Sequence, residues 1–516
     1  MSDKQIKILW IDDEIEHLKA HLIYLKEKGY DVETANNGTD ALTLIASNSY
    51  NLVFLDENMP GLSGLQTLAQ LKEIDPSLPV VMITKSEEED IMEQAIGSKI
   101  ADYLIKPVNP NQILLSIKKI LDQQRLVAQK TNSSYQSEFS RLSFKINDSF
   151  TFEEWIDVYR KLVFWELELQ QAGGAMDEVL KMQKAEANRE FAKFIKKNYL
   201  NWLAGDKGPM MSQQLFKTKV FPLLDEGKKV FFILIDNFRF DQWQTIRSDL
   251  STDFTIAEDA MYMSILPTAT QYARNAVFSG LMPAQMAQLY PQFWVEDEDE
   301  GSKNQFENEL IQTMLDRYRR KHKYSYNKIN DMESGKKLAD NYKSLLDNDF
   351  NVVVFNFVDM LSHARTEMKM IRELAGDEAA YRSLTLSWYM HSSLRDLLKK
   401  LANENVTVIM TTDHGTIRVN NPVKVVGDRT VNTNLRFKQG KNLAYNPKEV
   451  FEIKTPEKAL LPKQNVSSTY IFATNEDFFA YPNNYNHFVH YYRDTYQHGG
   501  ISLEEMLIPC VVMEKK

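Results

Sequence analysis

The chain of 516 residues contains a single cysteine, Cys510. One cysteine cannot form an intrachain disulfide, and without a cysteine cluster any bound metal must be held by histidine and carboxylate side chains. No stretch approaches the roughly 18 uncharged apolar residues that a membrane span needs. The first residues, MSDKQIKILWIDDE, carry acids where a secretory signal has its apolar run. We therefore expect a cytoplasmic protein without membrane insertion.

The chain also lacks an excess of positive charge, because its formal net charge is -10. A protein that coats duplex nucleic acid gains affinity by neutralising many phosphates, so this class is disfavoured. The sequence shows no dinucleotide fingerprint, no glycine loop that cradles phosphates and no helix-turn-helix with a basic recognition helix. A small or single-stranded anionic substrate is compatible with this charge, provided that cations gather at its site.

The composition, with 43% hydrophobic and 26% charged residues, is ordinary for a soluble globular protein. At roughly 100 to 200 residues per domain, the length predicts about three domains. Strand and helix patterns alternate over residues 1–122, helical periodicity alone covers 123–205, and a second alternation covers 206–516. We therefore predict an α/β multidomain protein, with a doubly wound parallel sheet, a helical bundle linker and a second α/β domain.

Polar residues stand at the ends of the strand-like runs in the front domain. Asp12 and Asp13 end the first run, Asp56 the third and Thr84 the fourth, and Lys106 follows the fifth. Ligands of doubly wound sheets bind at the carboxyl ends of strands. Three carboxylates at one edge repel one another and call for a hard cation such as Mg²⁺, which would ready Asp56 as a phosphoryl acceptor. Acids that merely cap strand ends are the alternative.

The segments IDDE, LDENMPGLSG, MITKS and DYLIKPV resemble the receiver domain of two-component response regulators, over about residues 5–122. The resemblance implies that Asp56 is phosphorylated, that Lys106 pairs with the phosphoryl oxygens, and that Thr84 and Tyr103 switch position. The Mg²⁺ ligands that it implies are Asp12, Asp13, Asp56 and the carbonyl of Asn58.

The middle segment shows apolar residues at helical spacing and no strand pattern. Thr151 and Glu154 have the spacing of a capping box, and Gly173-Gly174 offers a break between helices. Its aromatic stripe is a candidate partner surface, although this spacing is more typical of a core; the stripe comprises Trp155, Tyr159, Phe164 and Trp165. We expect the segment to transmit a signal or to support dimerisation.

The C-terminal domain places chemically active residues after apolar strands. KVFFILID ends in Asp236, and ILPTAT leads through Thr270 into a predicted helix. A hydroxyl there meets the unpaired N–H groups and positive dipole end of the helix, which favour an alkoxide and a bound phosphate. Asp359 and His363 follow NVVVFNF at i, i+4 spacing, which puts both on one face of a helix. A surface pair is the other interpretation of that spacing.

Two further pieces complete this pattern. VTVIMTTDHG ends a buried strand in Asp413 and His414, and YQHGG places His498 in a glycine-flanked loop. With His363, three of the 9 histidines stand in such contexts. Imidazole ligands suit Zn²⁺ better than Mg²⁺, so we expect zinc.

In this order the motifs resemble the alkaline phosphatase superfamily in its bacterial PglZ branch, over about residues 206–516. The resemblance implies two Zn²⁺ ions, one held by Asp359, His363 and His498 and the other by Asp236, Asp413 and His414. Thr270 would coordinate metal and act as the nucleophile, through a phosphothreonine intermediate. Thr268 is the rival nucleophile.

Substrate contacts are less defined. Arg274, one turn beyond Thr270, is a candidate to pair with a phosphate oxygen, with a surface role as the alternative. Between Arg418 and Lys454 the chain has eight Lys or Arg and three Asp or Glu, interleaved with aromatic and Asn residues. Such a segment can hold phosphates and stack bases, and a solvated insertion loop is the equal alternative.

The whole-chain order resembles the response regulators of type IX secretion in the Bacteroidota. That resemblance implies a sensor histidine kinase, a sigma factor and secretion-system proteins as partners, and phosphodiesterase action on cyclic or linear oligonucleotides. We expect phosphorylation of Asp56 to promote a homodimer and to regulate this activity. The alternatives are a non-catalytic regulator that acts through protein contacts, and a phosphomonoesterase or phosphoglycerate-type transferase.

Overall fold

The computed structural model describes residues 6–85, 100–295, 303–427, 432–463, 467–482 and 484–516. The chain forms two compact units, which are Met1–Ser134 with Gln171–Ala175, and Tyr135–Gln170 with Met176–Lys516. Among the described residues, no helix is both long enough and apolar enough to cross a membrane.

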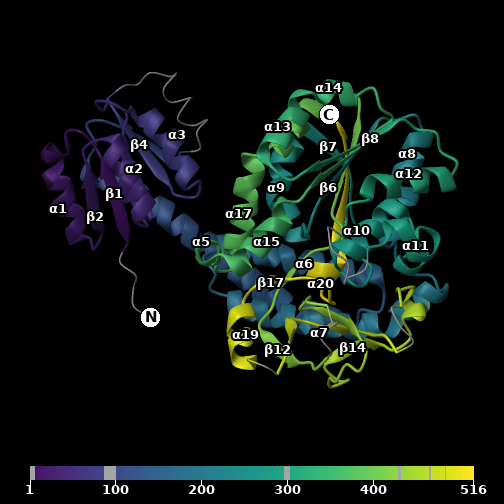
Figure 1. Cartoon of the computed structure of the whole chain (residues 1–516). Coiled ribbons are helices and arrows are strands. Elements are labelled where there is room, and N and C mark those ends of the chain that lie inside the picture. Colours follow the sequence, from purple (N-terminus) through teal and green to yellow (C-terminus); the bar gives the residue numbers. More distant parts are fainter. Residues whose placement is uncertain (1–5, 86–99, 296–302, 428–431, 464–466, 483) are drawn as a thin grey trace. The chain divides into compact units, whose positions relative to one another are not determined.

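The first unit contains a five-stranded parallel sheet in the order β2-β1-β3-β4-β5. Its strands are β1 (Lys7–Ile11), β2 (Asp31–Ala35), β3 (Leu52–Asp56), β4 (Val80–Thr84) and β5 (Asp102–Ile105). The helices between them are η1 (Ile15–Leu18), α1 (Lys19–Glu27), α2 (Gly38–Ser47) and α3 (Gly64–Ile74). Strands β3 and β4 are buried along their whole length, because helices cover both faces of the sheet (Figure 1). The predicted doubly wound parallel sheet is confirmed.

Three long helices follow, α5 (Pro110–Asn147), α6 (Phe152–Gln171) and α7 (Asp177–Ala204). The Thr151 hydroxyl accepts the Glu154 N–H at 3.2 Å, and the Glu154 carboxylate accepts the Thr151 N–H at 2.9 Å. This reciprocal capping box starts α6. Gly173 and Gly174, with φ of 86° and 71°, separate α6 from α7. The left-handed conformation there favours glycine, as the sequence pattern indicates.

The helices from Tyr135 onward share a hydrophobic core with the C-terminal region. Trp155 packs edge-on against Phe191 at 5.4 Å, and Tyr159 lies 5.8 Å from Phe240 of the C-terminal region. Trp155 and Tyr159 are therefore core residues. Phe164, on the opposite face of α6, is 52% exposed, so only part of the aromatic stripe is core.

The second unit is built on a six-stranded sheet in the order β7-β18-β10-β6-β9-β8. Its strands are β6 (Val230–Ile235), β7 (Phe254–Met263), β8 (Tyr324–Ile329), β9 (Phe350–Phe355), β10 (Thr407–Thr411) and β18 (Leu507–Lys515). Strands β10, β6, β9 and β8 are parallel, and β18 runs antiparallel to its two neighbours. Strands β6, β9 and β10 are fully buried, as expected for parallel strands covered by helices on both faces (Figure 1).

The helices around this sheet include α10 (Thr270–Ser279) and α15 (Phe357–Glu367), which carry site residues, and three more that follow or neighbour the site segments. These three are α9 (Phe240–Asp253), α17 (Glu378–Met390) and α20 (Leu503–Met506). The others are α8 (Phe221–Asp225), α11 (Pro283–Leu289), α12 (Glu307–Arg317), α13 (Met332–Asp340), α14 (Tyr342–Leu345), α16 (Lys369–Leu374), α18 (Ser393–Leu401) and α19 (Tyr485–Tyr492). Short turns are η2 (Ser212–Gln214), η3 (Phe216–Val220), η4 (Pro291–Phe293) and η5 (Pro456–Ala459).

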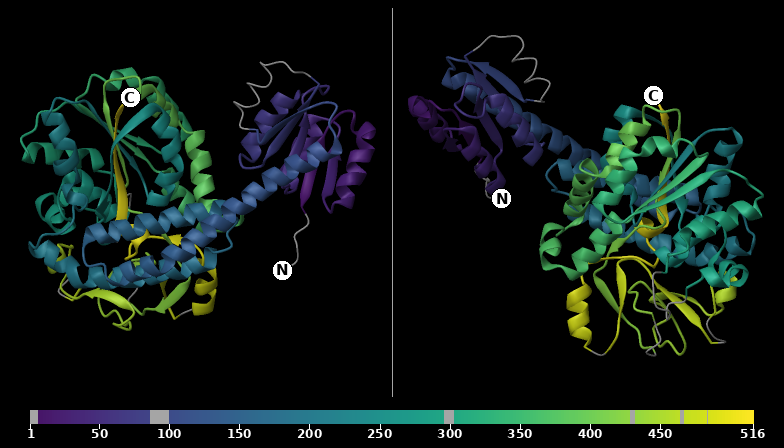
Figure 2. Two further views of the ribbon diagram at one scale, coloured as in Figure 1. Left: turned by 180° about the vertical axis from the view of Figure 1, so that it is seen from behind. Right: turned by 45° about the horizontal axis from the view of Figure 1, so that its top comes forward.

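An insertion of small sheets lies between β10 and β18, in the yellow-green part of the chain (Figure 2). Its strands are β11 (Ile417–Arg418), β12 (Asn421–Lys424), β13 (Phe437–Gly440), β14 (Val450–Ile453), β15 (Thr469–Ala473), β16 (Asp477–Ala480) and β17 (Tyr496–Gln497). The basic segment 418–454 belongs to this insertion, and its residues 428–431 lie outside the described part. Arg436 and Lys438 are 0% and 1% exposed. These two basic side chains are therefore neither solvated nor open to a substrate.

Candidate active site

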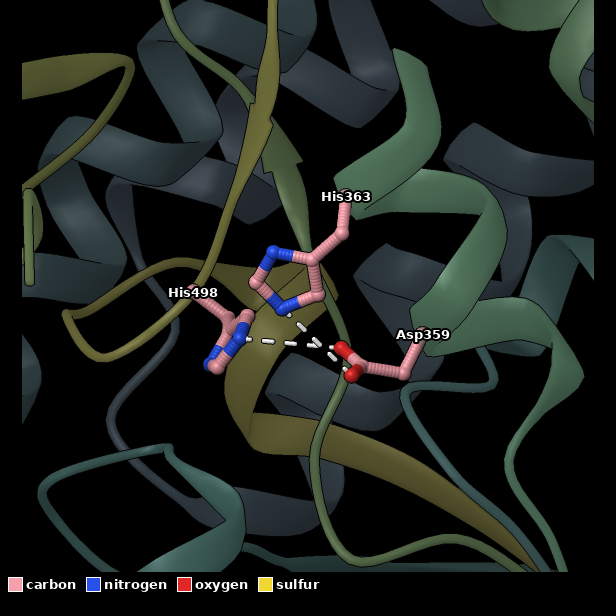
Figure 3. A group of neighbouring side chains, drawn as sticks. All are labelled: Asp359, His363 and His498. Atoms are coloured by element: carbon pink, nitrogen blue, oxygen red, sulfur yellow. Dashed lines mark ion pairs between the residues drawn. The ribbon is translucent and has the colours of Figure 1, made fainter. Parts of the chain in front are cut away.

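Asp359, His363 and His498 form one group of potential metal ligands (Figure 3). Asp359 lies in the first turn of α15, just after β9, and His363 lies one turn later on the same face. The His363 Nε2 is 3.4 Å from one carboxylate oxygen of Asp359, and the His498 Nε2 is 3.8 Å from the other. The His363 side chain is 62% exposed, so this group reaches the surface.

A second group, Asp236, Asp413 and His414, is buried. Asp236 follows β6, and Asp413 and His414 follow β10, which pairs with β6 in parallel. The carboxyl ends of adjacent parallel strands meet at one edge of the sheet, which brings these side chains together. The His414 Nε2 is 3.9 Å from both Asp236 and Asp413. In each group the potential ligand atoms lie within 4.8 Å of one another.

The two groups adjoin each other. The rings of His414 and His498 stack with centroids 4.3 Å apart. The Asn237 side chain donates to Asp359 at 3.3 Å, and its backbone N–H donates to Asp413 at 3.4 Å. Asn237 therefore ties the two groups together, and sequence reasoning missed it. The only sequence signal for Asn237 is its position next to Asp236 at the end of a strand. In the structure its φ is 61°, a left-handed conformation that Asn tolerates.

His414 and His498 are both anchored through Nδ1 and turn Nε2 towards the site. The Nδ1 of His414 is 3.0 Å from the carbonyl of Gly415, and the Nδ1 of His498 is 3.1 Å from the carbonyl of Thr268. A carbonyl only accepts, so each Nδ1 carries the proton. This backbone anchoring is the usual arrangement behind a metal-ligating histidine. Burial and the neighbouring His414 also lower the pKa of His498 well below its ordinary value, which keeps its imidazole neutral.

Thr270 is the first residue of α10, and its hydroxyl lies 3.0 Å from the Nε2 of His414. Thr268 is fully buried and faces the other way. Its hydroxyl donates to the carbonyl of Gly500 at 2.9 Å and accepts the N–H of Gly499 at 3.0 Å. Of the two threonines, Thr270 has its hydroxyl at the metal-ligand groups.

Gly499 must be glycine in this loop. Its φ is 121°, and a Cβ would come within 2.8 Å of both Phe437 and Asn434. Strand β13 comes so close that the residue after His498 must be glycine. The insertion that contains β13 therefore packs directly against this loop.

Arg274 lies one turn along α10 and is 1% exposed, so it is not a surface residue. Its guanidinium pairs with Asp236, and with Asp413 at 2.9 Å and Glu307 at 3.3 Å. Its donors therefore face ligand carboxylates, and pairing with a substrate phosphate would require it to leave them. Glu307, on α12, is a further residue that the sequence did not single out.

The pKa values of the two carboxylates in the buried group are shifted in opposite directions. Burial raises the pKa of Asp236 well above its ordinary value, although Arg274 opposes this shift. Burial also acts on Asp413, but Arg274 and His414 outweigh it and lower the pKa of Asp413 to about 2. The Oδ1 of Asp236 is buried and has no hydrogen-bond partner among the described residues. A buried carboxylate oxygen without a hydrogen-bond partner, 3.9 Å from an imidazole nitrogen, fits a bound divalent cation that prefers nitrogen and oxygen ligands.

The first unit holds a third group, Asp12, Asp13 and Asp56, at the carboxyl ends of β1 and β3. The Lys106 Nζ lies 2.8 Å from Asp12 and 3.1 Å from Asp56. Burial raises the pKa of Asp56, and Lys106 opposes the shift. The Oδ1 of Asp56 has no hydrogen-bond partner among the described residues, so this group also fits a cation.

The other residues singled out in the first unit lie around this group. Thr84 is buried at the end of β4, beside β5, which carries a half-buried Tyr103. Asn58 is exposed in the loop after β3.

Family comparisons agree with this geometry. Residues 8–118 match the response regulator receiver domain, 125–203 match the PorX response regulator linker domain, and 215–513 match the BREX system PglZ alkaline phosphatase-like domain. The last match covers more than half of the chain, and the chain therefore belongs to the PglZ family. It is a response regulator, and the three matches in this order are the architecture of PorX-type response regulators.

Curated relatives match the front of the chain. The transcriptional regulatory protein ZraR of Klebsiella oxytoca is 33% identical over 139 residues, which are 27% of this chain and 31% of that protein. The CpxR homolog of Haemophilus influenzae is 38% identical over 117 residues, which are 22% of this chain and 50% of that protein. The chain thus spans between 31% and 50% of the length of these relatives.

Solved structures match the same part. A response regulator receiver domain protein from Clostridium thermocellum is 32% identical and covers 23% of this chain and 98% of that chain, with a TM-score of 0.23. A CheY-like receiver domain protein from Methanospirillum hungatei JF-1 is 28% identical and covers 23% and 96%, with a TM-score of 0.23.

The matches to the receiver and PglZ family models have general consequences. A receiver domain implies a histidine kinase as partner. A PglZ domain places the C-terminal region in a phosphoesterase superfamily, and domains of both kinds usually bind metals.

Proposed function

We propose that this protein is a zinc-dependent phosphodiesterase whose activity is regulated by phosphorylation of Asp56. The observation that carries the proposal is the position of the Thr270 hydroxyl. It stands at the start of α10, 3.0 Å from His414, beside two adjoining groups of imidazole and carboxylate ligands. A nucleophile, a helix N-terminus and places for two metals are the parts that phosphoryl transfer from an ester requires.

The ligand set favours zinc. Each group offers carboxylate and imidazole donors, and the anchored Nδ1 atoms of His414 and His498 leave Nε2 free to coordinate. Asp359, His363 and His498 would hold one ion, and Asp236, Asp413 and His414 would hold the other, beside Thr270. When bound, the ions supply positive charge that stabilises the attacking and leaving oxygens of an in-line displacement.

The residues of the chain account for the remaining chemistry. Thr270 Oγ forms a bond to phosphorus while the bond from phosphorus to the leaving oxygen breaks, and the Thr270 proton leaves toward a base. Water then hydrolyses the phosphothreonine and restores the hydroxyl. The positive dipole end of α10 would favour the negative charge of the transferred group. Arg274 keeps the Asp236 and Asp413 carboxylates in place.

In the front domain, Asp12, Asp13, Asp56 and the Asn58 carbonyl would hold Mg²⁺, and Lys106 would pair with the phosphoryl oxygens after transfer from a sensor histidine kinase. Movement of Thr84 and Tyr103 would then favour a homodimer. We place the protein in the cytoplasm, with a sigma factor and type IX secretion proteins as further partners.

Cyclic or linear oligonucleotides are the proposed substrates. The exposed side of His363 supports this choice, because a chain substrate can approach a group that reaches the surface.

The test is hydrolysis of bis-p-nitrophenyl phosphate against p-nitrophenyl phosphate, with zinc content measured and with chelator added and then removed. We expect chelator-sensitive diester hydrolysis that returns with Zn²⁺. Preference for the monoester would identify a phosphomonoesterase instead. Release from neither substrate in a zinc-loaded protein would favour a regulator that acts through protein contacts. A panel of cyclic and linear oligonucleotides then identifies the substrate.

A further inference from the structure

A buried network of charged side chains joins helix α6 to the loop that follows β6. Glu166 of α6 accepts from Arg382 of α17 at 2.6 Å. Arg382 also donates to Asp241 of α9 at 3.2 Å, and Arg239 donates to the two oxygens of Asp241 from Nη2 at 2.6 Å and from Nε at 2.9 Å. Asp241 is thus shared by two arginines. Lys184 of α7 adds a contact to Glu166 at 2.7 Å.

Because the network is buried, each of its charges needs its partner. The side chains of Arg239, Asp241 and Arg382 are all 4% exposed or less. Burial acts to raise the pKa of Glu166, but Lys184 and Arg382 outweigh it and lower that pKa to about 2, so Glu166 is ionised. A buried pair that loses one partner leaves an uncompensated charge behind. The network therefore couples α6, α9 and α17, so that a shift of one helix must carry its ionic partners with it.

Arg239 carries this constraint to both metal-ligand groups. It lies three residues after Asp236 in the loop between β6 and α9. Its guanidinium lies 5.4 Å from the ring of Tyr381 and 5.5 Å from the ring of Tyr496, and these rings stack 4.0 Å apart. Tyr496 stands two residues before His498, so one side chain borders the segments of two ligands.

The loop between Asp236 and Arg239 has little freedom to absorb a shift. The backbone N–H of Phe238 donates to the Thr412 hydroxyl at 3.0 Å, next to Asp413. Asn237 contacts Asp359 and Asp413, as described above. These contacts tie the position of Arg239 to those of Asp236 and the other ligands.

Helix α6 has room to move on the network side. A cavity of about 310 Å³ borders the network, and its lining includes Glu166, Lys184, Glu378, Arg382 and Glu504. Side chains that face a cavity lose contacts on that side, so a shift there meets less resistance than in a close-packed core. Helix α6 follows α5 after a turn of four residues, and α5 begins just after the receiver sheet.

We propose that Glu166 and Arg382 are positioning residues through which helix α6 sets the geometry of the metal ligands Asp236 and His498. Through them the state of the front domain would reach the catalytic residues. This inference rests on the proposed phosphodiesterase function for its kinetic readout, and it has a second readout in metal affinity.

The experiment compares Glu166→Gln with Glu138→Gln in the full chain. Glu166→Gln keeps shape and removes only the charge that Arg382 faces. Glu138 pairs with Lys161 at 3.1 Å, also between linker helices, and takes no part in the network. Zinc affinity is measured by competition with a chromogenic chelator, kinetics with bis-p-nitrophenyl phosphate, and folding by thermal unfolding.

We expect Glu166→Gln to weaken zinc affinity or to lower kcat by about 10-fold to 100-fold, as loss of residues behind metal ligands does, with KM nearly unchanged. Glu138→Gln should match the wild type. Arg382→Lys, which keeps the cation but offers one contact, should fall between the wild type and Arg382→Met. If Glu166→Gln does not fold, the order of wild type, Arg382→Lys and Arg382→Met tests the proposal instead.

The outcomes separate the two proposals. Wild-type zinc affinity and kcat in both Glu166→Gln and Arg382→Met would overturn the network proposal, whatever the unfolding temperatures. A zinc-loaded wild type that hydrolyses no diester would instead refute the proposed function. In that case weaker zinc binding in Glu166→Gln, but not in Glu138→Gln, still supports the network.

Discussion

Replacing the two threonines near the site should have opposite effects on activity and stability. Thr270→Ala removes the proposed nucleophile, and Thr268→Val removes a buried hydroxyl without changing the size of the side chain. Because the two residues are neighbours in sequence, each variant controls for the other.

The structure gives the expected magnitudes. The Thr270 hydroxyl makes a hydrogen bond to His414, and a bond of this kind contributes about 0.5 to 1.5 kcal/mol to stability. Thr270→Ala should therefore melt within a few degrees of the wild type. Thr268→Val strands the N–H of Gly499 and the carbonyl of Gly500, and a buried unsatisfied group costs about 1 to 3 kcal/mol. This variant should be less stable by about 2 to 6 kcal/mol.

Activity should change in the reverse order. Loss of a nucleophile leaves only catalysis by binding and charge, so Thr270→Ala should lose at least about 10³-fold in kcat. Thr268→Val keeps the nucleophile, and the Thr268 carbonyl still anchors His498. We expect it to lose roughly 10-fold, through a shifted glycine loop. Thr270→Ser retains a hydroxyl and should restore much of the rate.

The assay is release of p-nitrophenol from the diester by zinc-loaded protein, with zinc content and unfolding temperature measured on the same preparations. Thr270→Ala should retain its zinc, because six other ligands remain. Activity of Thr270→Ala within about 10-fold of wild type would refute the reasoning and point to water as the nucleophile. Loss of all activity in a folded, zinc-loaded Thr268→Val would transfer the role to Thr268.

Three further predictions use other parts of the chain. Asp56→Ala should neither dimerise nor change its activity on treatment with a phosphoryl donor, as measured by light scattering and hydrolysis; a variant that dimerises and changes its activity as the wild type does would refute the proposed control by Asp56. Burial lowers the pKa of Lys438 to about 7, so the unfolded chain binds the extra proton and this residue's contribution to stability rises from about pH 7 to pH 10. The stability advantage of Lys438→Met over wild type should therefore shrink over that range, and a constant difference would contradict the buried neutral amine. Cys510 is fully buried, and burial raises its pKa to about 12, so a thiol reagent should label it only after unfolding.

Much of the fold and the site follows from local patterns. Apolar runs predicted β6, β9 and β10, and the acids at their ends predicted where ligands gather, because parallel strands deliver their carboxyl ends to one edge. The spacing of Asp359 and His363 already implied one helical face. The Thr151 capping box and the glycine break after α6 were also visible, since both depend on neighbours in sequence.

Other features depend on contacts between distant segments and left no local signal. Arg274 looked like a candidate for substrate, yet its nearest partners are Asp236, Asp413 and Glu307. Arg436 counted as one cation of a basic segment, and it is buried against Glu505 at 2.6 Å. Folding buries charged residues that are far apart in the chain next to one another, and this decides which of them pair.

The order of residues was therefore sufficient to predict which side chains gather at the two sites and which hydroxyl stands at a helix start, and it supplies the proposals that these side chains hold metal and that Asp56 accepts a phosphoryl group. These properties reside in a residue and its immediate neighbours. The folded chain added Asn237 between the two ligand groups, the orientation that distinguishes Thr270 from Thr268, and the route from Glu166 to Asp236. Those depend on close packing of segments separated by up to hundreds of residues, where a free energy of a few kcal/mol selects one arrangement and no short pattern records it.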